Sequence, residues 1–155
     1  MKQTTPYDQT LRAIGQSLEL QNVVVFDLKP QGSMYSVRAV VQKVKGLLNI
    51  FQKDKGLMEL SYTPQDIERC DKEGRARRQK SGRLPDFRSL SNMLRAIGSY
   101  LDEKGAQLLQ IQKGDQTVML LYKNSHGHPE VEERTLAAVS DMSLQMYKQR
   151  QKKTP

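Results

Sequence analysis

The sequence LRAIG occurs at residues 11–15 and recurs, letter for letter, at residues 94–98. The likeness continues past both copies, because each is followed by two apolar runs at matching distances: 23–28 and 35–41 after the first, 106–111 and 118–122 after the second. Self-similarity at a fixed spacing is typical of a chain that uses one structural unit twice. The sequence therefore predicts two related halves, which is a statement about architecture and not about chemistry.

Composition and charge narrow the class of protein. The 155 residues include 25 Lys and Arg against 17 Asp and Glu, a net charge of +8. Hydrophobic residues make up 37% of the chain, so we expect several solvated segments, but the apolar stretches are too regular for general disorder. Cys70 is the single cysteine of the sequence, which excludes an intrachain disulfide and a cysteine-based zinc site. Since no apolar leader and no apolar run of about 18–20 residues occurs, we expect a cytoplasmic protein without a membrane span.

The spacing of apolar residues predicts the elements of the first half. Between Pro6 and Asn22 they recur every three or four positions, as on one side of a helix. The expected elements after this helix are strands over 23–28 and 35–41 joined by a turn at 29–32, a strand over 47–51, a hairpin turn at 54–56, a strand over 58–62, and a helix from Pro64 to about Glu73.

The second half is expected to follow the same plan. A helix begins at Pro85 and ends at Gly105, because glycine favours the left-handed conformation that often follows a helix. Two strands and a polar loop come next, over 106–112, 116–123 and 124–128. The segments 64–69 and 129–134 both begin with proline and carry acidic residues, so the second is predicted to open the last helix as the first opens its own.

These elements predict an α+β fold. It consists of two related helix–strand–strand–helix repeats, with an extra hairpin in the first, an antiparallel sheet, and helices packed on one side. The expected organisation along the chain is a first repeat, a basic linker, a second repeat and a basic tail at 1–73, 74–84, 85–147 and 148–155. The repeats form either two domains or one compact pseudo-symmetric domain.

Gly15 and Gly98 hold the same place in two predicted helices, although glycine within a helix costs roughly 0.5–1 kcal/mol relative to alanine. A position at which glycine occurs twice is expected to require a small residue. We hypothesise that the two helices cross near these glycines about a pseudo-two-fold axis. The alternative is that each glycine packs closely on the sheet of its own half.

The strongest chemical feature is the stretch 74–83, which carries five positive charges and no acid, and the tail adds four more. The candidate nucleic-acid-binding residues are Arg75, Arg77, Arg78, Lys80, Arg83, Lys148, Arg150, Lys152 and Lys153. Arg and Lys release the counterions condensed on phosphates without reading base sequence. The alternative is a mobile, solvated linker that charge keeps soluble. Interleaved aromatic residues, which would stack on single-stranded bases, do not occur in this stretch.

Arg12 and Arg95 hold equivalent places in the two LRAIG segments, at the edge of the apolar side of each helix. We expect them to pair with carboxylates, as Asp8 is placed to do with Arg12 at a spacing of four residues. The alternative is that the two arginines flank a shared groove.

Other chemical motifs are weak or missing. His126, His128 and Glu130 have the side-chain types of metal ligands, but their spacing does not specify a complete ligand set, so we expect a polar turn and no metal. Cys70 lies among acidic residues, which disfavour a thiolate nucleophile. No glycine-rich phosphate loop, nucleophile elbow or zinc-protease helix occurs in the sequence, so neither a cofactor nor an enzyme is expected.

The sequence therefore predicts a non-enzymatic nucleic-acid-binding or nucleic-acid-associated accessory protein. Its contacts with DNA or RNA would be non-specific and salt-dependent, made by the basic linker and tail. The alternative is a protein-interaction or assembly module built on a duplicated scaffold, with no nucleic-acid ligand. Such a module would use its two similar faces, or an exposed sheet edge that accepts another strand.

Overall fold

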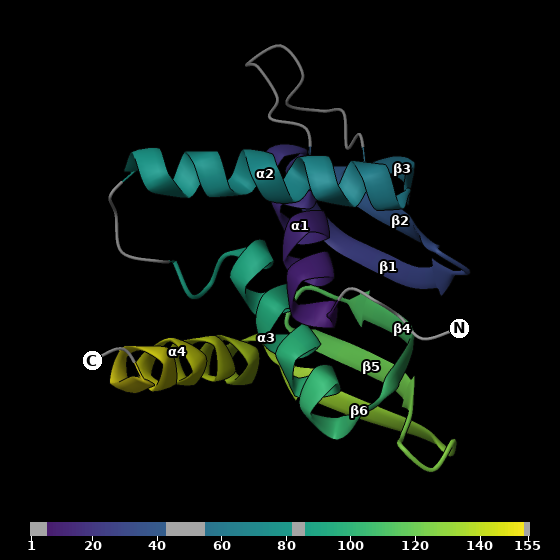
Figure 1. The fold of residues 1–155 in the computed structure, drawn as a ribbon. Coiled ribbons are helices and arrows are strands. Elements are labelled where there is room, and N and C mark those ends of the chain that lie inside the picture. Colours follow the sequence, from purple (N-terminus) through teal and green to yellow (C-terminus); the bar gives the residue numbers. More distant parts are fainter. Residues whose placement is uncertain (1–5, 43–54, 82–85, 154–155) are drawn as a thin grey trace.

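The computed structural model of the chain describes residues 6–42, 55–81 and 86–153. Its elements, in chain order, are α1 (Tyr7–Leu20), β1 (Val23–Gln31), β2 (Met34–Gln42), β3 (Lys55–Tyr62), α2 (Pro64–Ser81), α3 (Leu90–Lys104), β4 (Gln107–Lys113), β5 (Thr117–Lys123), β6 (Pro129–Thr135) and α4 (Leu136–Lys153) (Figure 1). The strands form one six-stranded sheet in the order β3-β2-β1-β4-β5-β6, and all neighbouring strands are antiparallel. The fold is therefore α+β with an antiparallel sheet, as the sequence predicts.

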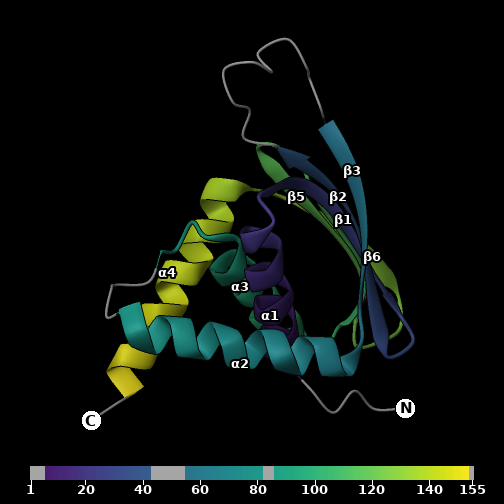
Figure 2. The same cartoon turned by 90° about the horizontal axis from the view of Figure 1, so that it is seen from above.

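The helices lie together on one face of the sheet, which curves around them (Figure 2). α1 and α3 pack against each other, α2 packs on α1, and α4 packs on α3. The core lies between helices and sheet, and alternate residues of each central strand point into it, such as Tyr35, Val37 and Ala39 of β2. Among the described residues, no helix is long and apolar enough to cross a membrane.

The ends of α1 and α3 follow from local chemistry. The side chain of Ser89 accepts a hydrogen bond from the N–H of Asn92 and caps α3, which ends at Gly105 with a left-handed φ of 61°. The end at Gly105 agrees with the sequence prediction. The start does not, because Ser89 supplies the cap; Pro85 lies outside the described residues. At α1 the cap position is Pro6, which offers no side-chain hydrogen bond.

Gly15 and Gly98 each lie against the first turn of the other helix. A Cβ atom on Gly15 would come 2.7 Å from the Cα atom of Ser91, and one on Gly98 would come 2.5 Å from the carbonyl oxygen of Tyr7. α1 and α3 therefore run antiparallel and approach so closely that neither position has room for a methyl group. Each glycine therefore lies against the other helix and not against the sheet of its own half, but the two lie toward the two ends of the contact and not at the single crossing point of the hypothesis.

Each of these helices also receives a carboxylate at its N-terminus from the other. Asp102 of α3 accepts hydrogen bonds from the N–H groups of Tyr7 (3.0 Å) and Asp8 (3.1 Å) of α1. Glu19 of α1 accepts one from the N–H of Ser91 in α3. The residues in these contacts form pairs 83 positions apart in the sequence: Asp8 and Ser91, Gly15 and Gly98, Glu19 and Asp102. The contact between α1 and α3 is thus reciprocal.

The prediction that the last helix begins at Pro129 is wrong, because residues 129–135 form β6. A tight turn brings them back beside β5: the side chain of Asn124 accepts hydrogen bonds from the N–H groups of His126 and His128, and Gly127 has a left-handed φ of 82°. The whole segment then pairs with β5, and this pairing outweighs the helix-like acidic start. In the described residues each half therefore runs helix, three strands, helix, and β3 has a counterpart in β6; the other strand of the predicted extra hairpin, 47–51, lies outside the described residues.

The predicted linker 74–84 is also corrected, because α2 continues through Ser81 instead of ending near Glu73. Gly74 is buried against the side chain of Gln16 in α1, so tertiary packing carries the helix through a stretch whose composition resembles a linker. The tail is helical as far as Lys153.

Smaller differences concern strands and turns of the first half. β1 runs to Gln31, so the turn predicted at 29–32 begins only after that residue. Residues 55 and 56 of the predicted hairpin turn belong to β3, where they pair with Gln42 and Val41. Asp54 and the predicted strand 47–51 lie outside the described residues.

Candidate functional site

The predicted basic residues lie on two helices, α2 and α4, whose C-terminal ends are on the same side of the molecule (Figures 1 and 2). Arg83 and the side chain of Lys153 lie outside the described residues. The others are all exposed on their helices, but they separate into two groups according to whether an ion pair or hydrogen bond holds the side chain to another residue.

In α2, the buried side of the helix determines this separation. Gly74 is buried, and Arg78, one turn later, lies on the same side and is directed at α1. The Gln16 side chain, with its amide oriented to satisfy both ends, donates to the carbonyl oxygen of Cys70 (3.0 Å) and accepts from Arg78. Arg78, although exposed overall, is thereby part of the helix–helix contact, and Arg77 beside it is exposed to solvent.

Asp71 is the central carboxylate of this contact. It lies 3.6 Å from Arg12 of α1 and 3.1 Å from Arg75, one turn along α2. The side chains of Arg12 and Asp71 are only 14% and 19% exposed, so Arg12 pairs with a carboxylate as predicted, but with Asp71 and not Asp8. Burial, and then the positive charge of Arg12, lower the pKa of Arg78. Positive charge is therefore in excess along the contact between α1 and α2.

In α4, Arg150 is the basic residue that contacts the body of the protein. Its guanidinium lies 3.7 Å from the carboxylate of Asp8 at the start of α1. Lys148 and Lys152, which are four residues apart, are exposed.

The exposed group thus consists of Arg77, Lys80, Lys148 and Lys152, and no ion pair of these four is found within the described ranges. The anchored group consists of Arg75, Arg78 and Arg150. The sequence did not distinguish the two groups, because the distinction depends on the helix continuing through residues 74–81 and on contacts with Gln16 and Asp8 of α1 that form only in the folded chain.

A second cluster, on the helix-covered side of β5 and β6, was not foreseen. The Tyr100 hydroxyl donates a hydrogen bond to Glu132 (2.9 Å), while Lys104 and Arg134 lie 4.8 and 4.7 Å from the centre of its ring. Lys104 also approaches the hydroxyl of Tyr122, and burial raises the pKa of that tyrosine to about 12. The cluster joins α3 to two strands, and Glu132 also lies 3.7 Å from Arg134, which indicates a stabilising network.

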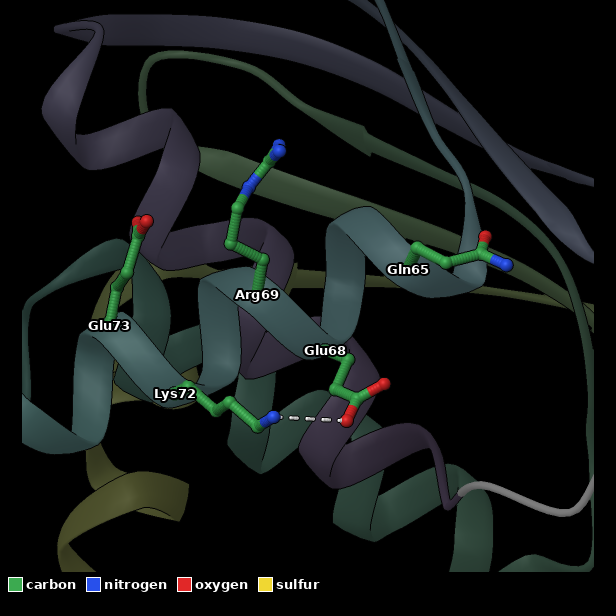
Figure 3. A pocket seen from close by; sticks show the side chains of 5 residues that line it. All are labelled: Gln65, Glu68, Arg69, Lys72 and Glu73. Atoms are coloured by element: carbon green, nitrogen blue, oxygen red, sulfur yellow. Dashed lines mark ion pairs between the residues drawn. The ribbon is translucent and has the colours of Figure 1, made fainter.

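A shallow hollow lies on the outer surface of α2, and Figure 3 shows its lining. The lining residues are Gln65, Glu68, Arg69, Lys72 and Glu73. Their charges are mixed, and Lys72 is paired with Glu68 at 3.3 Å. Because all five belong to one helix, the hollow does not bring together polar groups from different elements, as catalytic sites do.

The weaker candidates remain without a chemical role. His126 and His128 are exposed in the turn before β6, and no group of three His, Cys, Asp or Glu side chains fit to hold a metal occurs in the part of the chain that the structure describes. Burial raises the pKa of the Cys70 thiol, which disfavours the nucleophilic thiolate. Arg95 is half-buried in α3.

Comparison with known proteins adds no relationship: no protein-family model, curated protein or solved structure matches this chain. The chemistry of the molecule's own surface is therefore the basis for a function. Its most distinctive feature is the exposed cationic group at the ends of α2 and α4.

Proposed function

We propose that the protein is a non-enzymatic, nucleic-acid-associated protein that contacts phosphates through the exposed basic ends of α2 and α4. The observation that supports this best is that the C-terminal ends of α2 and α4, which carry the exposed residues Arg77 and Lys80 and the exposed residues Lys148 and Lys152, lie on the same side of the molecule. Phosphate contacts of this kind give affinity without base specificity.

The cations of α2 and α4 lie on helices, which favours phosphate contact over the alternative of a mobile, solvated linker. Helices hold side chains at regular spacing, so the entropy lost when they meet a phosphate backbone is lower than for a disordered segment. Cations in the last turn of a helix are also favoured by its dipole, by roughly 0.3–1 kcal/mol each. That effect does not account for the lack of any acidic residue between Gly74 and Ser81.

We further propose that the protein is built from two copies of one unit, which runs helix, three strands, helix. The reciprocal contacts of α1 and α3 support this, as does the symmetrical strand order of the sheet. At the centre of the sheet, Leu28 pairs with Ile111, which is 83 residues further along the chain. An approximate two-fold axis through this pair would relate the halves and place α2 and α4 in corresponding positions.

The test is a titration of the protein with a fluorescently labelled duplex and a labelled single strand, at low and at moderate salt. We expect binding at low salt that weakens steeply as salt rises. The variants Arg77→Gln/Lys80→Gln and Lys148→Gln/Lys152→Gln should each weaken binding to all sequences alike. Each should also reduce the slope of log affinity against log salt by about one for each phosphate that the variant no longer binds.

The matched control is Arg69→Gln/Lys72→Gln, which removes the same charge from the acidic first part of α2. It should leave the affinity close to that of the original protein. If the control weakens binding as much as the other two variants, net charge and not this surface is responsible. If neither nucleic acid binds at low salt, the proposal is wrong.

A further inference from the structure

The two edge strands of the sheet differ in chemistry. β3 (Lys55–Tyr62) has the sequence KGLMELSY, and β6 (Pro129–Thr135) has the sequence PEVEERT. Both lie at an end of the strand order, so each has one side on which no strand of the described ranges pairs with it. Unpaired N–H and C=O groups along such an edge are a template for another strand, and proteins commonly block them with charge or proline.

β6 has such a block. Pro129 has no N–H to donate, and Glu130 and Glu133 are exposed on the strand. Three glutamates in seven residues would repel a second copy of the same edge. The β6 edge is therefore protected against pairing with itself.

β3 has no comparable block. It pairs with β2 over eight consecutive positions without a bulge, so its backbone is regular along its whole length. Leu57, the third residue of the strand, is 65% exposed, so the edge strand presents an apolar side chain and not a charge at this position. The carboxylate of Glu59 lies 3.4 Å from Arg38 on β2, so its charge is partly neutralised within the same sheet.

We propose that β3 is the association surface for a second copy of this chain, whose β3 strand pairs with it antiparallel about a two-fold axis. In the register centred on Leu57, the two exposed leucines lie opposite each other on the same face of the joined sheet. The two sheets become one continuous sheet of twelve strands.

Two-fold pairing of β3 with β3 fits better than a head-to-tail arrangement of copies. Pairing β3 with the β6 edge of the next molecule would leave a free β3 and a free β6 at the ends, and the assembly would grow as an open chain. Pairing β3 with β3 consumes both unprotected edges and leaves only the charged β6 edges outside. This association is independent of nucleic-acid binding, because it involves neither α4 nor the basic end of α2.

The test is sedimentation equilibrium on the full chain, treated with nuclease, at several protein concentrations and at low and high salt. We expect a dimer whose stability changes little with salt, since hydrogen bonds and apolar contact dominate the interface. Leu57→Lys should raise the dimer dissociation constant at least about tenfold, because it places like charges opposite each other. A chain that is monomeric at all concentrations would overturn the proposal, as would larger oligomers that grow with concentration.

Val131→Lys is the matched control, because Val131 is the exposed apolar residue (62%) of the other edge strand. It should leave the dimer intact. If Val131→Lys dissociates the dimer and Leu57→Lys does not, the assignment of β3 is wrong. Leu57→Cys, in a Cys70→Ser background, gives a second measurement that does not depend on charge. Directly opposed cysteines on antiparallel strands lie within disulfide distance, so oxidation should yield a covalent dimer, and Val131→Cys should not.

Discussion

The two halves of the molecule share a layout but differ in the chemistry at corresponding places. Next to α1, Tyr62 of β3 donates a hydrogen bond to Ser17 (2.9 Å). At the corresponding place beside α3, the ring of Tyr100 lies under the guanidinium of Arg134. Ser17 and Tyr100 are 83 residues apart, as are Tyr35 and Val118, the strand partners of Tyr62 and Arg134. The same backbone arrangement thus accommodates a neutral contact in one half and a charged one in the other.

The similarity is closest where backbone meets backbone, between α1 and α3. The differences accumulate outward, at the third strand and the last helix of each half. The close helix pair therefore restricts the sequence more than the edges do. Substitutions at corresponding positions of the two halves can test this directly.

The largest effect is expected from Gly15→Ala and Gly98→Ala. Each added methyl group would meet backbone atoms of the opposite helix, which cannot rotate away as side chains do. Overpacking destabilises by about 1–3 kcal/mol and occasionally by more, and contacts this close with backbone atoms place both variants at the upper end, well above the up to about 1 kcal/mol of helix propensity that alanine regains. Urea unfolding should show similar losses for the two variants. Gly114→Ala is the control and should be close to neutral, because the nearest atom would be 3.7 Å from the added Cβ. A loss of stability at only one of the two helical glycines would contradict the reciprocal contact between α1 and α3.

An intermediate loss of stability is expected when either carboxylate cap is removed, and the loss should differ between the two caps. Asp102 bonds two N–H groups of α1, whose own cap position, Pro6, offers no side chain, whereas α3 is capped by Ser89 in addition to Glu19. Asp102→Ala should therefore lower the free energy of unfolding by about 1–2 kcal/mol, and Glu19→Ala by about half as much. Thermal denaturation of both variants checks the order. Equal losses would show that the caps are equivalent despite Ser89.

The smallest effect concerns pH. Burial raises the pKa of Tyr62 in the first half and of Tyr122 in the second, the latter to about 12. A tyrosine whose pKa is higher in the folded than in the unfolded state contributes stability that is complete below about pH 10 and is lost as pH rises through the folded value. The free energy of unfolding should therefore decline above about pH 10.

Phenylalanine at either position should make this decline shallower. At neutral pH, Tyr62→Phe also loses the bond to Ser17, at a cost of about 1 kcal/mol, while Tyr122→Phe loses only a weak interaction with Lys104. Denaturant unfolding at about pH 7 and about pH 11, on either side of the ordinary tyrosine pKa, measures both effects. A decline that is unchanged in both variants would mean that other groups titrate there.

Much of the fold can be read from the sequence where periodicity is strong. The helix over 7–20, the strands β2, β4 and β5, and the helix end at Gly105 all follow from apolar spacing and glycine chemistry. The segment 129–135 was misassigned because an acidic, proline-led stretch has a helix-like start, and only its pairing with β5 makes it a strand. The basic composition of the sequence predicted the residues of the candidate site. It did not predict which of these cations are held by contacts with other residues.

The sequence alone established that a helix recurs with its glycine, that strands follow each copy, and that positive charge gathers at two places, because spacing and composition are local properties. Tertiary packing determined that the two glycines lie against opposite helices, that residues 74–81 are helical, and that Arg78 and Arg150 contact α1. Those outcomes depend on contacts between residues far apart in the chain, for which local propensity carries no information.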